Sequence, residues 1–564
     1  MSAPIQAESS TAAAAAPRTY DDAIDALNSL QSNAATIEAL RKSGGRLLDF
    51  AIPEMVEYLQ RIGYTTSDLN RLNVIHITGT KGKGSTSAFV DSLLRQLTPV
   101  NASQAPPKVG LYTSPHMTSV RERIRINGQP VSHELFTTYF WQVWDRLSEN
   151  PERKFDLTPL RPVYFRFLTL LAFHIFLSER VQPVILEVGI GGKYDSTNIV
   201  PKCVVAGITQ LGLDHTAILG NTVEEIAVQK AGIFKSQAPA VCWAQQPGKA
   251  LDQVKRVANE VGVSDLQIVD VHPALRSEAA ALGDQDDANI VSLGLPGFHQ
   301  RTNASVALEL VNAYLDSEAG RAMFQQSAHR VSTQPDGGQV LAPWQKKGLQ
   351  DARWPGRCQT VPTARPDLAL TWYLDGAHTT DSLSVCLGWF TAIQQRRAAD
   401  KRNKRIFVFN CTNGRSAHEL LSAVLDAVEK GLGGQPASES SRYALSKDYF
   451  DEAIFTTNIT FEGGGWSSEL TSKLLDDAEL VNLTVQKQLA ETWKELVPGS
   501  STQVHITPSI QAMHNHVLDM AQQQGGKGGV DCLVCGSLHL VGGVMAHLQQ
   551  SKCLDDSLVS TVRL

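Results

Sequence analysis

Apolar runs and amphipathic stretches alternate along most of the chain. In the first half, apolar runs typical of strands occupy residues 74–78, 108–112, 183–188 and 203–209. The segments 86–97 and 163–177 between them repeat apolar residues with the period of a helix. Strands separated by helices are typical of a parallel sheet with right-handed crossovers. The pattern therefore predicts an α/β fold whose N-terminal domain is built on a mostly parallel sheet.

A second alternating unit begins near Trp354, with apolar runs at 368–374, 405–410, 453–457 and 531–535. This unit predicts a C-terminal Rossmann-like α/β domain, and a chain of 564 residues is too long for a single core. Between the two units, the segment from Ser332 to Pro343 is rich in Pro and Gly and has little periodicity, as in a linker. We expect a disordered tail at 1–17, an N-terminal domain at 18–330, a linker at 331–352 and a C-terminal domain at 353–564.

Composition narrows the class of partner and compartment. The net charge of −6 predicts no general attraction to nucleic acid, and no apolar stretch approaches the ~20 residues that a membrane helix needs. Eight scattered cysteines suit a reducing compartment. The first 17 residues are small and polar and lack the pattern of a secretory or transit peptide. A cytoplasmic protein is predicted, and a mitochondrial pool from another start site stays open.

The first strand runs into a glycine-rich turn, Gly79 to Ser85, before a helix. Backbone N–H groups of such a turn and the positive end of the following helix form a cradle for phosphate, where Lys83 would add a point charge. The usual pattern G-x-x-x-x-G-K-[ST] is broken, because Ile77 and Gly84 stand where Gly and Ser or Thr are expected. A tight turn with a solvated lysine is the alternative. We predict a P-loop ATPase domain.

Three further segments place polar residues directly after predicted strands. Ser114 follows the second strand, Glu187 ends the third, and His215 follows the fourth. Ligands of open parallel sheets bind at these carboxyl ends. Glu187 and a hydroxyl suit Mg²⁺, whereas histidine is a less usual ligand for it. A single residue of this kind is more often structural, so the prediction depends on their convergence beside one P-loop.

At this point the chain resembles the Mur ligase and folylpolyglutamate synthase superfamily, and within it the eukaryotic folylpolyglutamate synthases. The motifs that carry the resemblance are T-G-T-K-G-K-G-S-T, T-S-P-H, L-E-V-G-I-G-G, L-G-L-D-H-T, Q-K-A-G, W-P-G-R and Y-L-D-G-A-H-T. They follow one another in family order over about residues 60 to 390. In this family Gly84 is a regular feature of the loop rather than a defect.

The resemblance implies a role for each matching residue. The ATP contacts it implies are Gly82, Lys83, Gly84, Ser85, Arg357 and Asp375. It places Mg²⁺ on Ser114, Glu187 and His215, and a monovalent cation such as K⁺ is a further candidate. The residues implied in catalysis are Lys83, Lys230 and His378, with Lys230 matching a lysine that is carbamylated in related ligases. For Lys230, a lysine that faces the dipole at the end of its helix is the alternative.

The implied reaction is the ATP-dependent addition of L-glutamate to the γ-carboxyl of tetrahydrofolate or a folylpolyglutamate through an acyl phosphate. The expected partners are these two substrates, and a monomer is expected. Dihydrofolate synthase, which glutamylates dihydropteroate, and Mur-type peptide ligation are the alternatives within the ligases. A P-loop NTPase switch is the alternative from another class, although it would need Ser or Thr where Gly84 stands.

Overall fold

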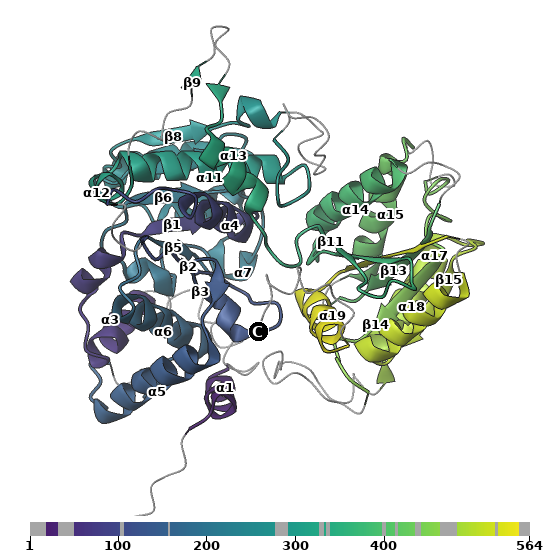
Figure 1. Ribbon diagram of the computed structural model, residues 1–564, viewed down its shortest axis with the longest axis horizontal. Coiled ribbons are helices and arrows are strands. Elements are labelled where there is room, and N and C mark those ends of the chain that lie inside the picture. Colours follow the sequence, from purple (N-terminus) through teal and green to yellow (C-terminus); the bar gives the residue numbers. More distant parts are fainter. Residues whose placement is uncertain are drawn as a thin grey trace, which may run out of the picture.

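The computed structural model describes residues 18–31, 50–101, 106–155, 158–276, 291–325, 332–333, 339–396, 402–411, 416–434, 442–462, 482–524 and 528–551. Within these residues the chain forms two α/β domains that lie side by side, each built on its own sheet (Figure 1). The α/β class predicted from the sequence is confirmed. The predicted tail at 1–17 lies outside the described residues.

The N-terminal domain is built on an eight-stranded sheet with the order β4-β3-β2-β5-β1-β6-β7-β8. Its strands are β1 (Ile75–Thr78), β2 (Gly110–Tyr112), β3 (Ile124–Ile126), β4 (Gln129–Pro130), β5 (Val184–Glu187), β6 (Val205–Ile208), β7 (Ala240–Trp243) and β8 (Leu266–Val269). Six strands pair in parallel, whereas the pairings of β2 with β3 and of β3 with β4 at one edge are antiparallel. The central strands β5, β1 and β6 therefore end side by side at one edge of the sheet.

Helices cover both faces of this sheet, so its central strands are buried throughout. One face packs against α1 (Tyr20–Ser29), α3 (Ala51–Arg61), α5 (His133–Glu149), α6 (Tyr164–Ser178), α8 (Val223–Ala231) and α9 (Ala250–Val261). The other packs against α4 (Lys83–Leu94), α11 (Gln300–Asp316) and α13 (Pro343–Asp351). The two shorter helices are α7 (Thr216–Leu219) and α12 (Glu318–Met323).

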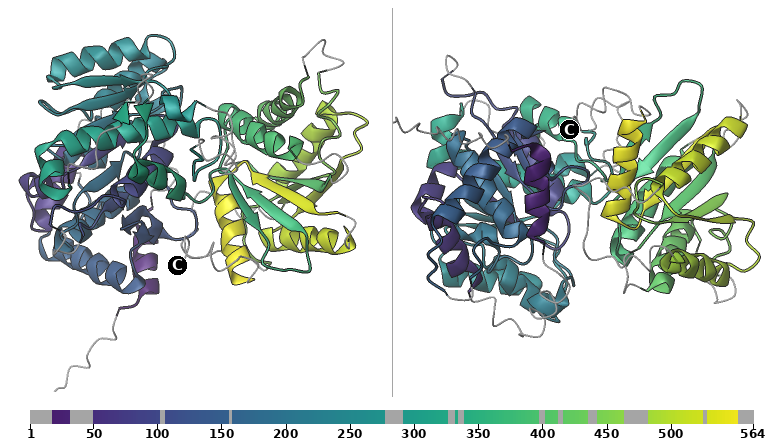
Figure 2. Two further views of the ribbon diagram at one scale, coloured as in Figure 1. Left: turned by 45° about the horizontal axis from the view of Figure 1, so that its top comes forward. Right: turned by 90° about the horizontal axis from the view of Figure 1, so that it is seen from below.

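The C-terminal domain is built on a six-stranded sheet with the order β11-β12-β16-β13-β14-β15. Its strands are β11 (Gln359–Pro362), β12 (Leu370–Leu374), β13 (Lys404–Phe409), β14 (Glu452–Thr456), β15 (Gln503–Thr507) and β16 (Val530–Cys535). Only β11 is antiparallel to its neighbour. Among the described residues, one face of this sheet packs against α14 (Thr380–Gln395), α15 (Ala417–Gly431) and α17 (Thr484–Leu496). The other face packs against α18 (Ile510–Gln524) and α19 (Leu538–Gln550) (Figure 2).

The interval 331–352, predicted as a linker, contains regular structure. Its described residues form a short hairpin of β9 (Ser332–Thr333) and β10 (Gln339–Val340), followed by helix α13. This helix packs on α4, where the Ser92 hydroxyl donates to the Gly348 carbonyl at 2.7 Å. Gly348 and Pro343 stand in that interval because α13 needs a small residue against α4 and a proline at its first turn. The chain then crosses to the second sheet between α13 and β11.

The cysteines that the structure describes pack in the interior. All seven are buried, and among the described residues none is part of a disulfide. Cys532 and Cys535 lie on β16, and their side chains belong to the cores on opposite faces of the sheet. Among the described residues, none of the helices has the length and apolar character to cross a bilayer.

Candidate active site

A cavity of about 1650 Å³ lies between the two domains. The N-terminal domain lines it with the loops that follow β1, β2, β5 and β6, and the C-terminal domain lines it with the loop after β12 and the crossing segment. The carboxyl ends of parallel strands thus face this space, as expected for an α/β ligand site. Every site residue predicted from the sequence lines the cavity except Lys230.

The turn from Gly79 to Ser85 is held against the loop after β6. The backbone N–H groups of Thr80 and Lys81 donate to the Gln210 carbonyl at 2.8 and 3.0 Å. Gly82 precedes α4 with a φ of 85°, and a Cβ at this position would collide with the Asn303 side chain from α11. Only glycine fits both the backbone and the space. The first turn of α4 lines the cavity, and the first N–H groups of a helix have no partner within the helix itself.

Two lysine side chains meet at one carbonyl beneath this turn. Lys83 Nζ donates to the Gly79 oxygen at 3.0 Å, and Lys230 Nζ donates to the same oxygen at 2.8 Å. Lys230 lies at the end of α8 and is buried. Burial, followed by the charge of Lys83, lowers the pKa of Lys230 to about 7, and burial also lowers the pKa of Lys83. A substantial fraction of the Lys230 amine is therefore uncharged near neutral pH.

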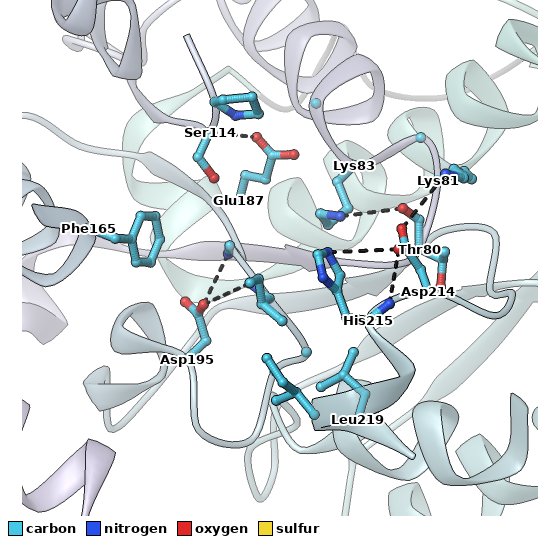
Figure 3. Close-up of a pocket in the computed structure, with 18 of the residues that line it drawn as sticks. Thr80, Lys81, Lys83, Ser114, Phe165, Glu187, Asp195, Asp214, His215 and Leu219 are labelled. Atoms are coloured by element: carbon cyan, nitrogen blue, oxygen red, sulfur yellow. Dashed lines mark hydrogen bonds and ion pairs between the residues drawn. The ribbon is translucent and has the colours of Figure 1, made fainter. Parts of the chain in front are cut away.

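Glu187, the last residue of β5, presents a buried carboxylate to the cavity beside Lys83 (Figure 3). Its Oε2 accepts the Ser114 backbone N–H at 3.0 Å, so the loop after β2 lies directly against the end of β5. Burial raises the pKa of Glu187, whereas Lys83 and Arg357 oppose this shift. A bound cation would offset the cost of burying this carboxylate.

His215 and its neighbour Asp214 lie across the cavity from Ser114 in Figure 3. His215 has a φ of 51°, and its Nε2 lies 4.0 Å from Asp214 Oδ1. Asp214 Oδ2 also lies 3.7 Å from Lys81 Nζ. Burial lowers the pKa of His215, which favours the neutral ring that a metal requires. Sequence reasoning missed Asp214, although it stands next to His215 in the same motif.

Asp195 is a second residue that sequence reasoning missed. Its Oδ2 accepts the backbone N–H groups of Gly189 and Ile190, both at 3.1 Å, and its Oδ1 accepts from Thr197. The glycine-rich loop after Glu187 thus wraps around the Asp195 carboxylate, and these hydrogen bonds fix the conformation of the loop. Its position in the sequence, a few residues after the glycines of the L-E-V-G-I-G-G motif, could have indicated this role.

The C-terminal domain contributes Arg357, Asp375 and His378. Asp375 is buried, and its two oxygens accept the backbone N–H groups of Cys358 at 2.7 Å and Ala377 at 2.8 Å. These bonds tie the crossing segment to the end of β12, so both oxygens of the carboxylate have a structural role. The adjacent Arg357 guanidinium lines the cavity and donates to the Gly356 carbonyl at 3.0 Å.

The ring of His378 is held in one tautomer. Its Nδ1 lies 2.7 Å from the Gly376 carbonyl oxygen, which can only accept, so Nδ1 carries a proton. In the neutral ring Nε2 is then the nitrogen that can accept a hydrogen bond or a proton. This arrangement is suited to accepting a proton from a substrate in the cavity.

The donor set fits a magnesium ion. Glu187 offers a carboxylate, Ser114 a hydroxyl and His215 an imidazole, all at the wall of one cavity beside the glycine-rich turn from Gly79 to Ser85. Oxygen donors together with substrate phosphate are what Mg²⁺ takes in such sites, and the raised pKa of Glu187 marks a carboxylate that lacks full charge compensation in the protein alone.

Known proteins resemble this chain over nearly its whole length, although no protein-family model matches it. The folylpolyglutamate synthase of Candida albicans is 40% identical over 547 residues, which cover 95% of this chain and 97% of that protein. That of Saccharomyces cerevisiae is 38% identical over 533 residues, covering 94% and 86%. A solved structure, Mycobacterium tuberculosis folylpolyglutamate synthase complexed with ADP, has a TM-score of 0.61 and 21% identity, covering 93% of this chain and 98% of that one. The structural likeness spans both domains.

Proposed function

The chain belongs to the folylpolyglutamate synthase family, and on that premise we propose that its cavity joins L-glutamate to the γ-carboxyl of a folate, with cleavage of ATP to ADP and phosphate. The observation that carries the proposal is that the glycine-rich turn from Gly79 to Ser85, called the phosphate turn below, lines one cavity between the domains together with Glu187 and His378. The space of about 1650 Å³ is large enough to hold two substrates beside one another.

The first step turns a poor electrophile into a good one. A γ-carboxylate oxygen of the folate attacks the terminal phosphorus of ATP, and the bond from that phosphorus to the bridging oxygen breaks. ADP departs, and the folate now carries an acyl phosphate. The N–H groups at the start of α4 and the Lys83 ammonium stabilise the charge that spreads over the phosphate oxygens. We assign the ATP contacts to Gly82, Lys83, Gly84, Ser85 and Arg357, and Mg²⁺ to Ser114, Glu187 and His215, where the ion would neutralise phosphate charge.

The second step forms the amide. The amine of the incoming glutamate must lose a proton before it attacks the acyl carbon, after which phosphate leaves. Because Nδ1 of His378 already donates to Gly376, Nε2 is the acceptor for this proton. Arg357 and His378 come from the C-terminal domain, so the site is complete only when both domains enclose the substrates. This enclosure keeps water from the acyl phosphate.

Lys230 is the proposed site of a carbamate. Its amine, with a pKa lowered to about 7, is nucleophilic near neutral pH and could add to CO₂ with release of a proton. The product would be an anion beneath the phosphate turn, next to Lys83, and would replace the repulsion between two ammonium groups by attraction. Mass spectrometry of active protein under native conditions tests this, and a bare amine would remove the idea.

The substrate assignment is tested with labelled glutamate and ATP against a panel of pteroates and folates. We expect incorporation into tetrahydrofolate and into its short polyglutamates. Incorporation into dihydropteroate without extension of tetrahydrofolate would instead identify a dihydrofolate synthase. Turnover of ATP that does not depend on any folate would identify an NTPase of another class.

A further inference from the structure

Two histidines and a glutamate meet in the C-terminal domain, outside the cavity described above. Glu452 begins β14, His505 lies on β15 and His516 lies on α18. In the parallel pairing of these strands Ile454 is opposite His505. Because side chains two residues apart on a strand share a face, Glu452 and His505 both face α18. Three separate elements thus direct metal-binding side chains to one point.

The Nε2 atoms of both rings lie near the same carboxylate oxygen. Glu452 Oε2 lies 2.7 Å from His516 Nε2 and 3.4 Å from His505 Nε2. The two rings lie with their centroids 4.5 Å apart. Two ligand atoms that share a tetrahedral zinc ion at about 2.0–2.1 Å lie roughly 3.3–3.4 Å apart. The distance from Glu452 to His505 already matches this separation, and the distance from Glu452 to His516 would have to widen to admit an ion.

The hydrogen bonds of the protein do not fully explain this arrangement. Within the part of the chain that the structure describes, His505 Nε2 is buried and makes no hydrogen bond. The Glu452 side chain is 4% exposed, whereas those of His505 and His516 are 32% and 31% exposed. A buried carboxylate under two partly exposed imidazoles leaves the site accessible to solvent, which can supply water as a further ligand.

We propose that Glu452, His505 and His516 form a binding site for a divalent transition-metal ion, with zinc as the ion it takes. Two imidazole nitrogens and one carboxylate are ligands that Zn²⁺ accepts, and they discriminate against Mg²⁺ and Ca²⁺, which prefer oxygen. The site lies at the amino end of β14, whereas the cavity lies beyond the carboxyl ends of the parallel strands. It is therefore separate from the ATP-dependent chemistry, and it joins α18 to the edge of the sheet.

The test uses the full chain, stripped of metal with a chelator and kept in excess Mg²⁺. Zinc chloride is titrated calorimetrically into the wild type, His505→Gln, His516→Gln and the control His418→Gln, whose histidine is exposed on α15. We expect one zinc site in the wild type and the control, and at least tenfold weaker binding in the other two variants. Zinc should also raise the thermal midpoint of the wild type.

Equal zinc stoichiometry and affinity in all four proteins would overturn the proposal. Because a histidine variant could fail to fold, crystals of the wild-type chain soaked in zinc chloride provide an independent result. Anomalous scattering at the zinc edge is expected between Glu452 and the two rings, and zinc density found only elsewhere would contradict the proposal. Glutamate addition by the folded His505→Gln variant should equal that of the wild type.

Discussion

At the scale of single residues, the contacts of individual side chains set the shape of the phosphate turn and the positions of the candidate metal ligands. The sequence could single out Glu187, Ser114 and His215 as candidates because each ends or follows a strand in a recognisable motif. It could not show that both oxygens of Asp375 are bound to backbone N–H groups, since these bonds depend on the path of the crossing segment. It also could not reveal Asn303, which reaches the turn from a helix more than two hundred residues later.

Replacing Glu187 by Gln should remove turnover while the fold persists. The amide keeps the size of the side chain and can still accept the Ser114 N–H, but it lacks the charge that would hold a cation near the phosphates. We expect kcat/KM to fall by about 10²–10³-fold, as for loss of one major electrostatic contact. Steady-state kinetics and folate binding measure the two effects, and Glu491→Gln on the exposed side of α17 is the control. Unchanged turnover would refute the metal assignment.

Replacing Gly82 by Ala tests the shape of the turn. The change carries the strain of a left-handed backbone, about 1–2 kcal/mol, and adds a collision with Asn303. Gly63 has a similar φ of 92° with nothing within 4 Å of a Cβ, so Gly63→Ala carries the strain alone. We expect both variants to lose stability in chemical denaturation and only Gly82→Ala to lose affinity for ATP. Equal ATP affinities would show that the turn does not hold phosphate.

At the scale of elements, the alternating pattern predicted most of the strands that carry the site. The predicted runs 405–410, 453–457 and 531–535 correspond to β13, β14 and β16 within one residue at each end. The edge strands β8 and β15 lacked a continuous apolar run, because an edge strand is partly exposed and carries polar residues. Helix α13 was missed since its buried face is short and its glycine serves close packing.

The contact among α5, α6 and the loop after α3 gives the N-terminal domain a sensitivity to acid. His174 on α6 is buried, with Nδ1 2.8 Å from the Tyr64 hydroxyl and Nε2 2.8 Å from Gln142 Oε1. Burial lowers the pKa of His174 to about 4, and Arg146 adds to this shift. In the unfolded chain its pKa is about 6.5, so the unfolded state binds more protons between these values.

The contribution of His174 is therefore fully present above pH 6.5 and is lost as the pH falls towards 4. We expect this residue to account for about 3 kcal/mol of the fall in the free energy of unfolding across that window. Denaturant melts of the wild type and His174→Gln at several pH values measure it. The variant should show a smaller slope of stability against pH, and an equal slope would contradict the assignment.

At the scale of the whole molecule, the site depends on how the two domains meet. Met117, in the loop after β2, contacts Gly356 of the crossing segment and Gly542 of α19. A Cβ on Gly542 would collide with the Met117 carbonyl oxygen. The sequence could predict two domains from the two alternating units, but it could not predict this contact because it joins residues far apart in the chain.

Gly542→Ala should therefore separate the halves of the cavity without unfolding either domain. Misplacing reacting groups by about 1 Å can reduce a rate on the order of 10²-fold, so we expect a fall of that size in kcat/KM. Small-angle X-ray scattering should report a larger radius of gyration. Gly388→Ala is the matched control, because this helical glycine on α14 has nothing within 4 Å of a Cβ. Wild-type kinetics in Gly542→Ala would show that this contact does not position the domains.

The most direct test of the central claim follows an oxygen atom from folate to phosphate. Tetrahydrofolate carrying heavy oxygen in its γ-carboxyl is incubated with ATP, L-glutamate and the enzyme, and the products are weighed by mass spectrometry. The proposed acyl phosphate predicts that each added glutamyl residue is accompanied by one ADP and by one phosphate that carries a heavy oxygen. Phosphate without the label, or ADP formed without extension of the folate, would contradict the account.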